Sequence, residues 1–150
     1  MSEITIRQAT PADLEALVPL FDAYRRFYGR SSDPLAAGNF LRERFERGES
    51  VLFIAHDGDT PVGFTQLYPS FSSVSLGRIF VLNDLFVHEK GRKKGVGTRL
   101  LAAATEFARA AGAVRLTLST ATTNHVAQSV YAAARWKRDE QFYVYNFALP

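Results

Sequence analysis

The sequence predicts a mixed α/β protein in which helices cover both faces of one sheet, and two observations support this fold class. Apolar strands at 51–55 and 62–67 are joined by an Asp-Gly turn, the pattern of an antiparallel hairpin. Apolar runs at 78–87 and 114–118, each typical of a buried strand, flank an amphipathic helix. Such a strand, helix, strand unit closes as a right-handed parallel crossover. One sheet is therefore expected to contain both antiparallel and parallel pairing.

The N-terminal third is predicted to contain one strand and two helices. Apolar and polar residues alternate across 3–9, as in a half-buried strand. Thr10 and Pro11 then combine an N-cap with proline at the first helical position. A second helix is predicted to begin after Asp33, another N-cap residue, and to end at Gly48.

The rest of the chain continues to alternate strands and helices. A polar, aromatic loop is predicted at 68–73, before the strand at 78–87. The clearest helix covers 98–111, with its apolar residues on one face. Another helix is predicted at 123–134, and the β-prone tail at 141–149 indicates a final strand.

The composition restricts the class of protein. A chain of 150 residues has room for one core and one domain, 1–150. No apolar run approaches the roughly 20 residues that span a bilayer, and the N-terminus has no signal-peptide layout. We therefore expect a cytoplasmic protein with no membrane partner. There is no cysteine, and the three histidines lack the spacing of a zinc site, so no metal is expected.

Residues 92–98, Arg-Lys-Lys-Gly-Val-Gly-Thr, carry the strongest functional signal, because they lie between a strand and a helix. Two glycines allow a tight turn, and a helix N-terminus presents unpaired N–H groups to an anion. The segment is thus interpreted as a phosphate cradle, with a solvated basic loop as the alternative. It is not a P-loop, since Val96 and Gly97 follow Gly95, and Leu100 stands where a dinucleotide fingerprint requires its third glycine.

The charge distribution favours a compact ligand over a polymer. The net charge is +3, which is small for a dedicated nucleic-acid binder, and the basic residues gather around one turn. A polyphosphate suits this turn better than a nucleic-acid backbone does. We therefore expect no nucleic-acid partner.

Taken in this order, the motifs resemble those of the GNAT superfamily of acetyl-CoA-dependent N-acetyltransferases, along the whole chain. The loop 92–97 has the form Arg/Gln-x-x-Gly-x-Gly/Ala, and Asn124, Ala127 and Tyr131 form a series on the later helix. The third motif is the hairpin that leads into the strand ending at 83–87. The resemblance implies a mixed, mostly antiparallel central sheet of six to seven strands flanked by about four helices.

The resemblance also implies that acetyl-CoA binds as a co-substrate. The backbone of Leu85, Phe86 and Val87 would hydrogen-bond the pantetheine arm as an added strand does. Asn124 and Tyr131 would lie near the reactive end of the cofactor. The loop and the start of the helix would hold the pyrophosphate, and Arg92 would lie alongside it. The residues that would hold it are Lys93, Lys94, Gly95, Val96, Gly97 and Thr98.

Two residues are candidates for the catalytic chemistry. Tyr131 matches the family's proton donor, and a phenol with a pKa near 10 can protonate the departing thiolate. Periodicity alone favours a core role for Tyr131, whereas the resemblance favours the catalytic one. Asp84, embedded in an apolar strand, is the best acidic candidate for the base. Two alternatives stay open for Asp84: a carboxylate bonded to backbone, or one that only binds a cationic substrate.

The acceptor is expected to be a primary amine of a small molecule, either a polyamine or diamine or an amino acid. Tyr68, Phe71, Tyr143 and Tyr145 are candidate aromatic walls of its pocket, with Asp84 as the floor. Alternatively, the tail aromatics pack on the sheet or form a homodimer contact. The alternative functions are acetylation of a peptide or protein lysine or N-terminus, and a non-catalytic CoA-binding regulatory module.

Overall fold

The computed structural model of the protein describes residues 3–150, which form two compact units, 3–119 and 120–150. The second unit contains one helix, α4 (His125–Ala133). Two short 3-10 helices, Pro11–Asp13 and Glu89–Gly91, also lie in the first unit. The other elements of the first unit are β1 (Ile4–Gln8), α1 (Leu14–Phe27), α2 (Pro34–Arg47), β2 (Val51–Asp57), β3 (Thr60–Ser72), β4 (Gly77–Val87), α3 (Val96–Ala110) and β5 (Arg115–Thr117).

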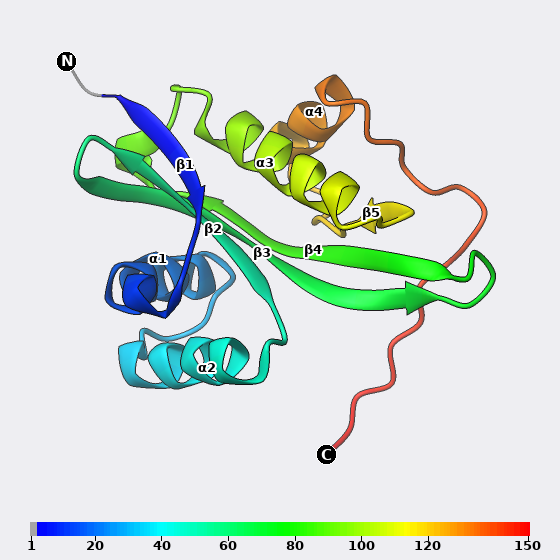
Figure 1. Ribbon diagram of the computed structural model, residues 1–150, viewed down its shortest axis with the longest axis horizontal. Helices are drawn as coiled ribbons and strands as arrows, with labels where there is room; N and C mark the ends of the chain where they lie inside the picture. The colour runs from blue at the N-terminus through cyan, green and yellow to red at the C-terminus, as the bar shows by residue number, and fades with distance from the viewer. Residues whose placement is uncertain (1–2) are drawn as a thin grey trace. The chain divides into compact units, whose positions relative to one another are not determined.

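The described strands form one mixed sheet in the order β1-β2-β3-β4-β5. The first four strands pair antiparallel, and β4 pairs parallel with β5 after the crossover through α3. Helices α1 and α2 cover one face of the sheet and α3 covers the other (Figure 1). The predicted fold class and its four α-helices are therefore confirmed.

The predicted number of strands is wrong, because five strands are described instead of six to seven. The expected final strand at 141–149 is not formed, and this segment has no regular secondary structure. Its large side chains are exposed, Tyr143 and Tyr145 each by 89%. A β-prone sequence becomes a strand only where it finds a pairing partner, and the local pattern cannot supply that information.

The start and end signals of the first two helices are confirmed. Thr10 is the N-cap of the short 3-10 helix that leads into α1, and Asp13 completes a capping box with it. Asp33 caps α2, since its Oδ1 accepts a hydrogen bond from the backbone N–H of Ala36 at 3.1 Å. Gly48 ends α2 in the left-handed conformation, with φ of 60°.

The hairpin of β3 and β4 is longer than predicted. The expected loop at 68–73 is mostly strand, because β3 continues to pair with β4 from Tyr68 opposite Val81 to Ser72 opposite Gly77. Cross-strand pairing thus overrides a local composition that is typical of a loop.

The register of this hairpin shifts near its middle. Gln66 lies opposite Asp84, whereas the next residue, Leu67, lies opposite Leu82. Asn83 is therefore the extra residue of a β-bulge, a feature that bends a strand and redirects its side chains.

The parallel pairing of β4 with β5 is short. It covers only three residues of each strand, Ile79–Val81 with Arg115–Thr117. Among the described strands, none pairs with this side of β4 beyond Val81. The prediction that 114–118 is a buried strand is also wrong, since β5 is short and largely exposed, as expected for an edge strand.

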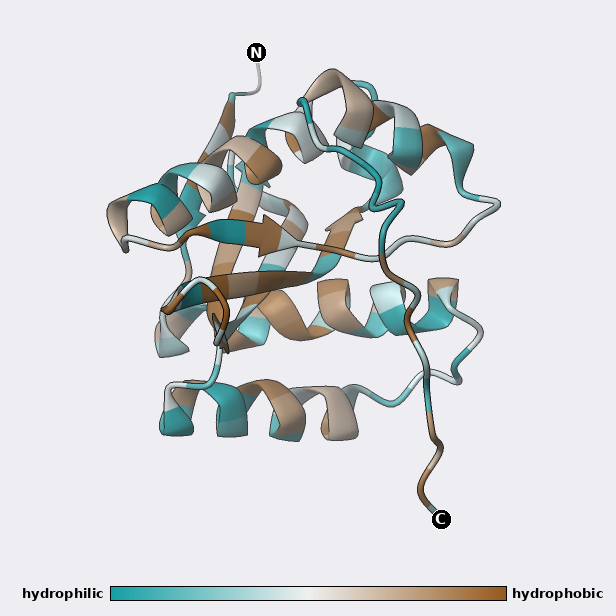
Figure 2. Cartoon of the chain, turned by 90° about the vertical axis from the view of Figure 1, so that its right-hand side faces the viewer, coloured by the Kyte–Doolittle hydropathy of each residue, from teal (hydrophilic) through white to brown (hydrophobic). Residues whose placement is uncertain are grey.

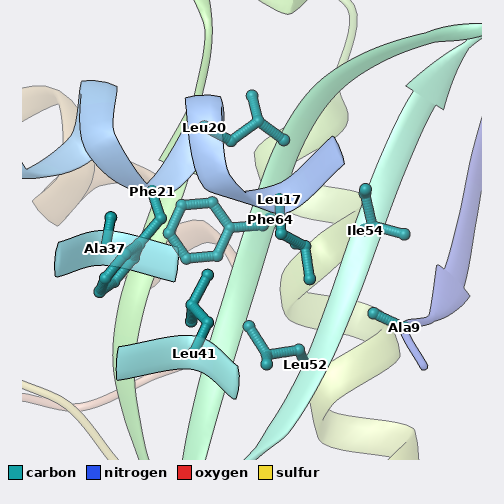
Figure 3. Packing of buried hydrophobic residues seen from close by; sticks show 9 residues of the cluster. All are labelled: Ala9, Leu17, Leu20, Phe21, Ala37, Leu41, Leu52, Ile54 and Phe64. Atoms are coloured by element: carbon teal, nitrogen blue, oxygen red, sulfur yellow. The ribbon is translucent and has the colours of Figure 1, made fainter. Parts of the chain in front are cut away.

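The larger core cluster lies between the sheet and the pair α1 and α2. Figure 3 shows the ring of Phe64 pointing from β3 toward α1, beside Leu17 and Phe21. Phe64 and Leu17 are fully buried, and each such side chain contributes roughly 1.5–3 kcal/mol relative to an exposed one. In Figure 2 the central strands are mostly brown, whereas α1 and α2 combine brown and teal residues. A second cluster lies under α3 and consists of Phe53, Ala55, Val62, Val96 and Leu100.

Candidate active site

Asp84 lies on β4 directly after the bulge and is only 2% exposed. The side-chain amide of Gln66 donates a short hydrogen bond to its Oδ2, and Asn83 Nδ2 donates to its Oδ1 at 2.9 Å. Burial raises the pKa of Asp84, and hydrogen bonds from Gln66, Asn83 and Tyr24 offset only part of this effect. A carboxylate with a raised pKa is well suited to accept a proton near neutral pH.

A cavity of about 520 Å³ opens next to Asp84, between the sheet and the helices α1 and α2. We call it the α1–α2 cavity. Its volume lies in the range typical of small-molecule sites. The residues that line it are Phe21, Tyr24, Arg25, Tyr28, Arg30, Ala36, Ala37, Phe40, Tyr68, Asn83 and Asp84.

The two phenols nearest to Asp84 stay protonated at neutral pH. Burial, followed by the negative charge of Asp84, raises the pKa of Tyr68 to about 12. The same two causes raise the pKa of Tyr24 even further. The Tyr24 hydroxyl donates a hydrogen bond to the backbone oxygen of Asn83 at 3.2 Å. Both phenols can therefore orient a ligand as hydrogen-bond donors, while Asp84 is the group able to accept a proton.

The structure brings together only some of the residues that were predicted to line one pocket. Tyr68 and Asp84 do line one cavity, as expected. Phe71 does not line it; this residue is 69% exposed, and the guanidinium of Arg78 stacks on its ring at 4.2 Å. Tyr143 and Tyr145 belong to an exposed segment of the second unit.

Sequence reasoning missed the walls that α1 and α2 supply. Tyr24 and Tyr28 are one helical turn apart, and their rings meet edge to face at 5.1 Å. Phe40 adds a wall from α2. The spacing of four residues between two tyrosines was the available signal, but it is equally typical of an aromatic pair in a helix.

The expected pantetheine-binding residues lie where β4 has no described partner on its outer side. Phe86 and Val87 pair with β3 through Phe64 and Gly63. Gly63 allows close approach, since a Cβ atom there would lie 2.9 Å from the carbonyl oxygen of Phe86. No described strand pairs with the opposite edge of this segment, which includes Leu85, and β-augmentation requires such an unpaired edge.

The segment predicted as a phosphate cradle leads into α3, as expected for its position before a helix. Gly95 is the N-cap of α3 and adopts φ of 74°, a left-handed conformation that favours glycine. No side chain caps the helix, and its first turn contains no acidic residue. The first turn of α3 thus supplies no carboxylate to its own positive end, which is the arrangement expected where a ligand brings an anion.

The basic residues of the loop have different local partners. Arg92 Nε donates to the backbone oxygen of Val87 at 3.2 Å, which ties the loop to the end of β4. Lys94 Nζ lies 2.6 Å from Asp57 Oδ2 and ties the loop to β2. Lys93 has φ of 64°, so its exposed side chain projects from a left-handed backbone position. Arg92 and Lys94 therefore hold the loop in place and also contribute positive charge to it.

Two further findings concern metal ligands and membrane spans. Within residues 3–150, no three histidine, cysteine, aspartate or glutamate side chains are grouped so that they could hold a metal ion. No helix in the same residues has the length and apolar character needed to cross a membrane.

Comparison with known proteins identifies the family. Residues 15–135 match the profile of the Acetyltransferase (GNAT) family. The chain belongs to this family. The GNAT resemblance predicted from the sequence is therefore confirmed, and the protein is an N-acetyltransferase.

Three similar proteins agree with this assignment. The chain is 47% identical over 147 residues to the uncharacterized N-acetyltransferase YhfO of Bacillus subtilis (strain 168), covering 98% of this chain and 99% of YhfO. It is 27% identical over 147 residues to the D-amino-acid N-acetyltransferase HPA3 of Saccharomyces cerevisiae, covering 95% and 91% of the two chains. A crystal structure of a probable acetyltransferase, 42% identical, superposes with a TM-score of 0.92 over 97% of this chain and 98% of that chain.

The two remaining GNAT motif residues lie in the second unit. The Oδ1 of Asn124 accepts a hydrogen bond from the backbone N–H of Ala127 at 3.1 Å, so Asn124 is the N-cap of α4. Tyr131 lies on α4, with its ring centroid 6.2 Å from that of Trp136. Arg135 follows the helix with φ of 70°, a left-handed conformation that favours glycine.

Proposed function

We propose that this N-acetyltransferase moves an acetyl group from acetyl-CoA to the primary amine of a small molecule, by direct transfer within a ternary complex. The observation that carries the proposal is the buried carboxylate of Asp84, which lines the α1–α2 cavity from a strand whose outer edge has no described strand partner beyond Val81. A proton acceptor and an extended binding edge thus occupy one short stretch of β4.

The cofactor would be held by the residues expected from the GNAT motifs. Leu85, Phe86 and Val87 would offer backbone groups to the pantetheine arm along the part of β4 that has no described strand partner on its outer edge. The start of α3, from Val96 to Thr98, offers N–H groups and the positive end of a helix to the pyrophosphate. Arg92, Lys93, Lys94, Gly95 and Gly97 complete the expected set. Acetyl-CoA supplies the thioester when bound.

The acceptor would be a small amine bound in the α1–α2 cavity. Aromatic walls attract an ammonium group, and Asp84 supplies the opposite charge at the buried end. The printed name of the relative HPA3, a D-amino-acid N-acetyltransferase, supports an acceptor of this size. The cavity volume of about 520 Å³ also fits a small molecule.

The chemistry requires two proton transfers. The alkylammonium must lose a proton before its nitrogen can attack the thioester carbon, and Asp84 would accept that proton directly or through water. The carbon–sulfur bond then breaks, and the departing thiolate would take a proton from the phenol of Tyr131. Asn124 would contact the cofactor near this reactive end. The chain has no cysteine to carry the acetyl group, which favours the direct route.

The proposal is tested by ligand-dependent melting and by turnover with a panel of amines. Acetyl-CoA at about 100 times its Kd should stabilise the fold by about 2.7 kcal/mol, whereas ATP should not. Asp84→Asn should keep this shift and lower kcat/KM by about 10²–10⁴-fold. Leu67→Met is the control, because Leu67 is a buried residue of the neighbouring strand and the change nearly conserves its volume. This variant should keep both the stabilisation by acetyl-CoA and the turnover. Stabilisation by ATP alone, or full turnover by Asp84→Asn, would contradict the proposal.

A further inference from the structure

We infer that the acceptor carries a carboxylate as well as an amine, and that Arg25 and Arg30 form the anion subsite that binds it. The inference rests on the proposed function, which it narrows from small amines in general to amino acids. Both arginines line the α1–α2 cavity together with Asp84. Asp84 is buried, Arg25 is half-buried and Arg30 is exposed, so the acidic group lies deep and the basic groups lie toward solvent.

The end of α1 brings the two arginines together. Gly29 adopts φ of 85°, and its N–H donates to the backbone oxygen of Arg26 at 2.9 Å. The N–H of Arg30 donates to the backbone oxygen of Arg25 at 3.0 Å. These two bonds form a Schellman motif, which reverses the chain after the last turn of the helix. The backbone of Arg30 is thereby fixed next to that of Arg25, at the rim of the cavity.

Nearby carboxylates do not neutralise this pair. Asp22 accepts hydrogen bonds from Ser32 Oγ at 2.8 Å and from the backbone N–H of Asp33 at 2.7 Å, and it pairs with Arg26 at 3.4 Å. Asp33 itself caps α2. None of the ion pairs between described residues involves Arg25 or Arg30. The charge of Arg25 does act on Asp22, as one of several causes that lower its pKa.

The resulting charge pattern selects among acceptors. A diamine or polyamine would place one ammonium near Asp84 and another beside two guanidinium groups, where like charges repel. An amino acid would instead place its amine toward Asp84 and its carboxylate toward Arg25 and Arg30. Guanidinium groups bind carboxylates with two parallel hydrogen bonds, which adds geometric selection to the attraction.

The test compares three acceptors that differ only in their carboxyl group: lysine, lysinamide and cadaverine. We expect kcat/KM for lysine to exceed the values for both others at least tenfold. Arg30→Gln should bring the three values to within about threefold, and Arg25→Gln should act in the same direction. Arg42→Gln is the matched control, because Arg42 lies on α2, is exposed and does not line the cavity. It should leave the preference unchanged.

Binding of the products separates this inference from the proposed function. Calorimetry on the complex with CoA should give tighter binding of acetyl-lysine than of N-acetylcadaverine, and Arg30→Gln should remove the difference. This readout needs no turnover, so it tests the subsite even if none of the amines is acetylated. Equal or tighter binding of N-acetylcadaverine by the unmodified protein would overturn the inference, as would an undiminished lysine preference in Arg30→Gln. Acetylation of cadaverine alone would overturn the inference and leave the proposed function intact.

Discussion

Gln66 donates a hydrogen bond from its side-chain amide to the carboxylate of Asp84, and both side chains are buried in the paired strands β3 and β4. The other amide atom of Gln66, Oε1, is buried and has no hydrogen-bond partner in the described structure. The hydrogen bond from Gln66 therefore stabilises the charged form of Asp84, but it leaves the buried acceptor Oε1 of Gln66 unpaired. Its contribution is to hold down a pKa that burial raises.

Replacing Gln66 should shift the pH dependence of catalysis. Gln66→Met keeps the length of the side chain but removes the donor, so the pKa of Asp84 should rise further above its ordinary value. A base works only when deprotonated, hence the acid limb of the profile of kcat/KM against pH should move to higher pH. Leu67→Met serves as the control and should keep the limb in place. A shift to lower pH would contradict the proposed role of Asp84.

Asp84 should also weaken the fold near neutral pH. Its folded-state pKa is raised, so the folded protein holds a proton that the unfolded chain has already released, and stability falls as pH rises through that window. Asp84→Asn removes this charge, and a flip of the Gln66 amide lets Oε1 accept from the new amide. We expect a higher Tm at pH 7, where each 1 kcal/mol corresponds to about 2–4 °C in a chain of this size.

The pH dependence of that gain is the diagnostic measurement. As pH falls below the folded-state pKa of Asp84, the unmodified protein also becomes neutral at this position. The difference in Tm between Asp84→Asn and the unmodified protein should therefore shrink toward acid pH. A gain that is independent of pH would mean that packing, and not the buried charge, limits stability at this site.

The elements that were predicted correctly are those whose information is local. Asp33 caps the start of α2 with its own side chain, and Gly48 ends α2 through its own backbone conformation. The turn at Gly95 likewise depends on the conformational freedom of one residue. The burial of Asp84 in a strand was also predicted correctly, because an acidic residue in an apolar strand is conspicuous in the sequence alone; its role as the base stays a prediction.

The features that could not be predicted from the sequence depend on contacts between distant segments. Tyr24 lines the cavity because α1 packs on β3 and β4 there, and helical periodicity gives only the face of a helix, not what that face meets. Gln66 reaches Asp84 through a strand register that includes a bulge, and a shift of one residue turns a side chain to the opposite face. The exposed tail failed as a strand for the same reason, since pairing is not a local property.

The start of α3 offers a test of cofactor binding that does not depend on catalysis. Gly97 lies in the first turn of α3, where a Cβ atom would meet only Val87, at an ordinary distance of 3.8 Å. Gly97→Asp places a carboxylate at the positive end of the helix and should stabilise the free protein by about 0.3–1 kcal/mol. The same carboxylate repels the pyrophosphate, so the affinity for CoA should fall at least about tenfold.

Gly97→Ala is the matched control for this change. It adds the same Cβ without charge and should keep CoA affinity closer to that of the unmodified protein, as measured by calorimetry. The combination of a raised Tm and weakened CoA binding is specific to an anion site at the helix terminus. Unchanged CoA affinity in Gly97→Asp would place the pyrophosphate elsewhere.

The proposed role of Tyr131 as the proton donor can be tested by removing only its hydroxyl oxygen. Tyr131→Phe keeps the ring that packs near Trp136 and removes the hydroxyl that would protonate the thiolate. Because binding and proton donation are separate functions, the Kd for CoA should stay unchanged while kcat falls at least about tenfold. The deficit should be larger when chemistry limits turnover, which a pre-steady-state measurement of acetyl transfer can establish. If that transfer rate is unchanged in Tyr131→Phe, the proton reaches the thiolate from another donor.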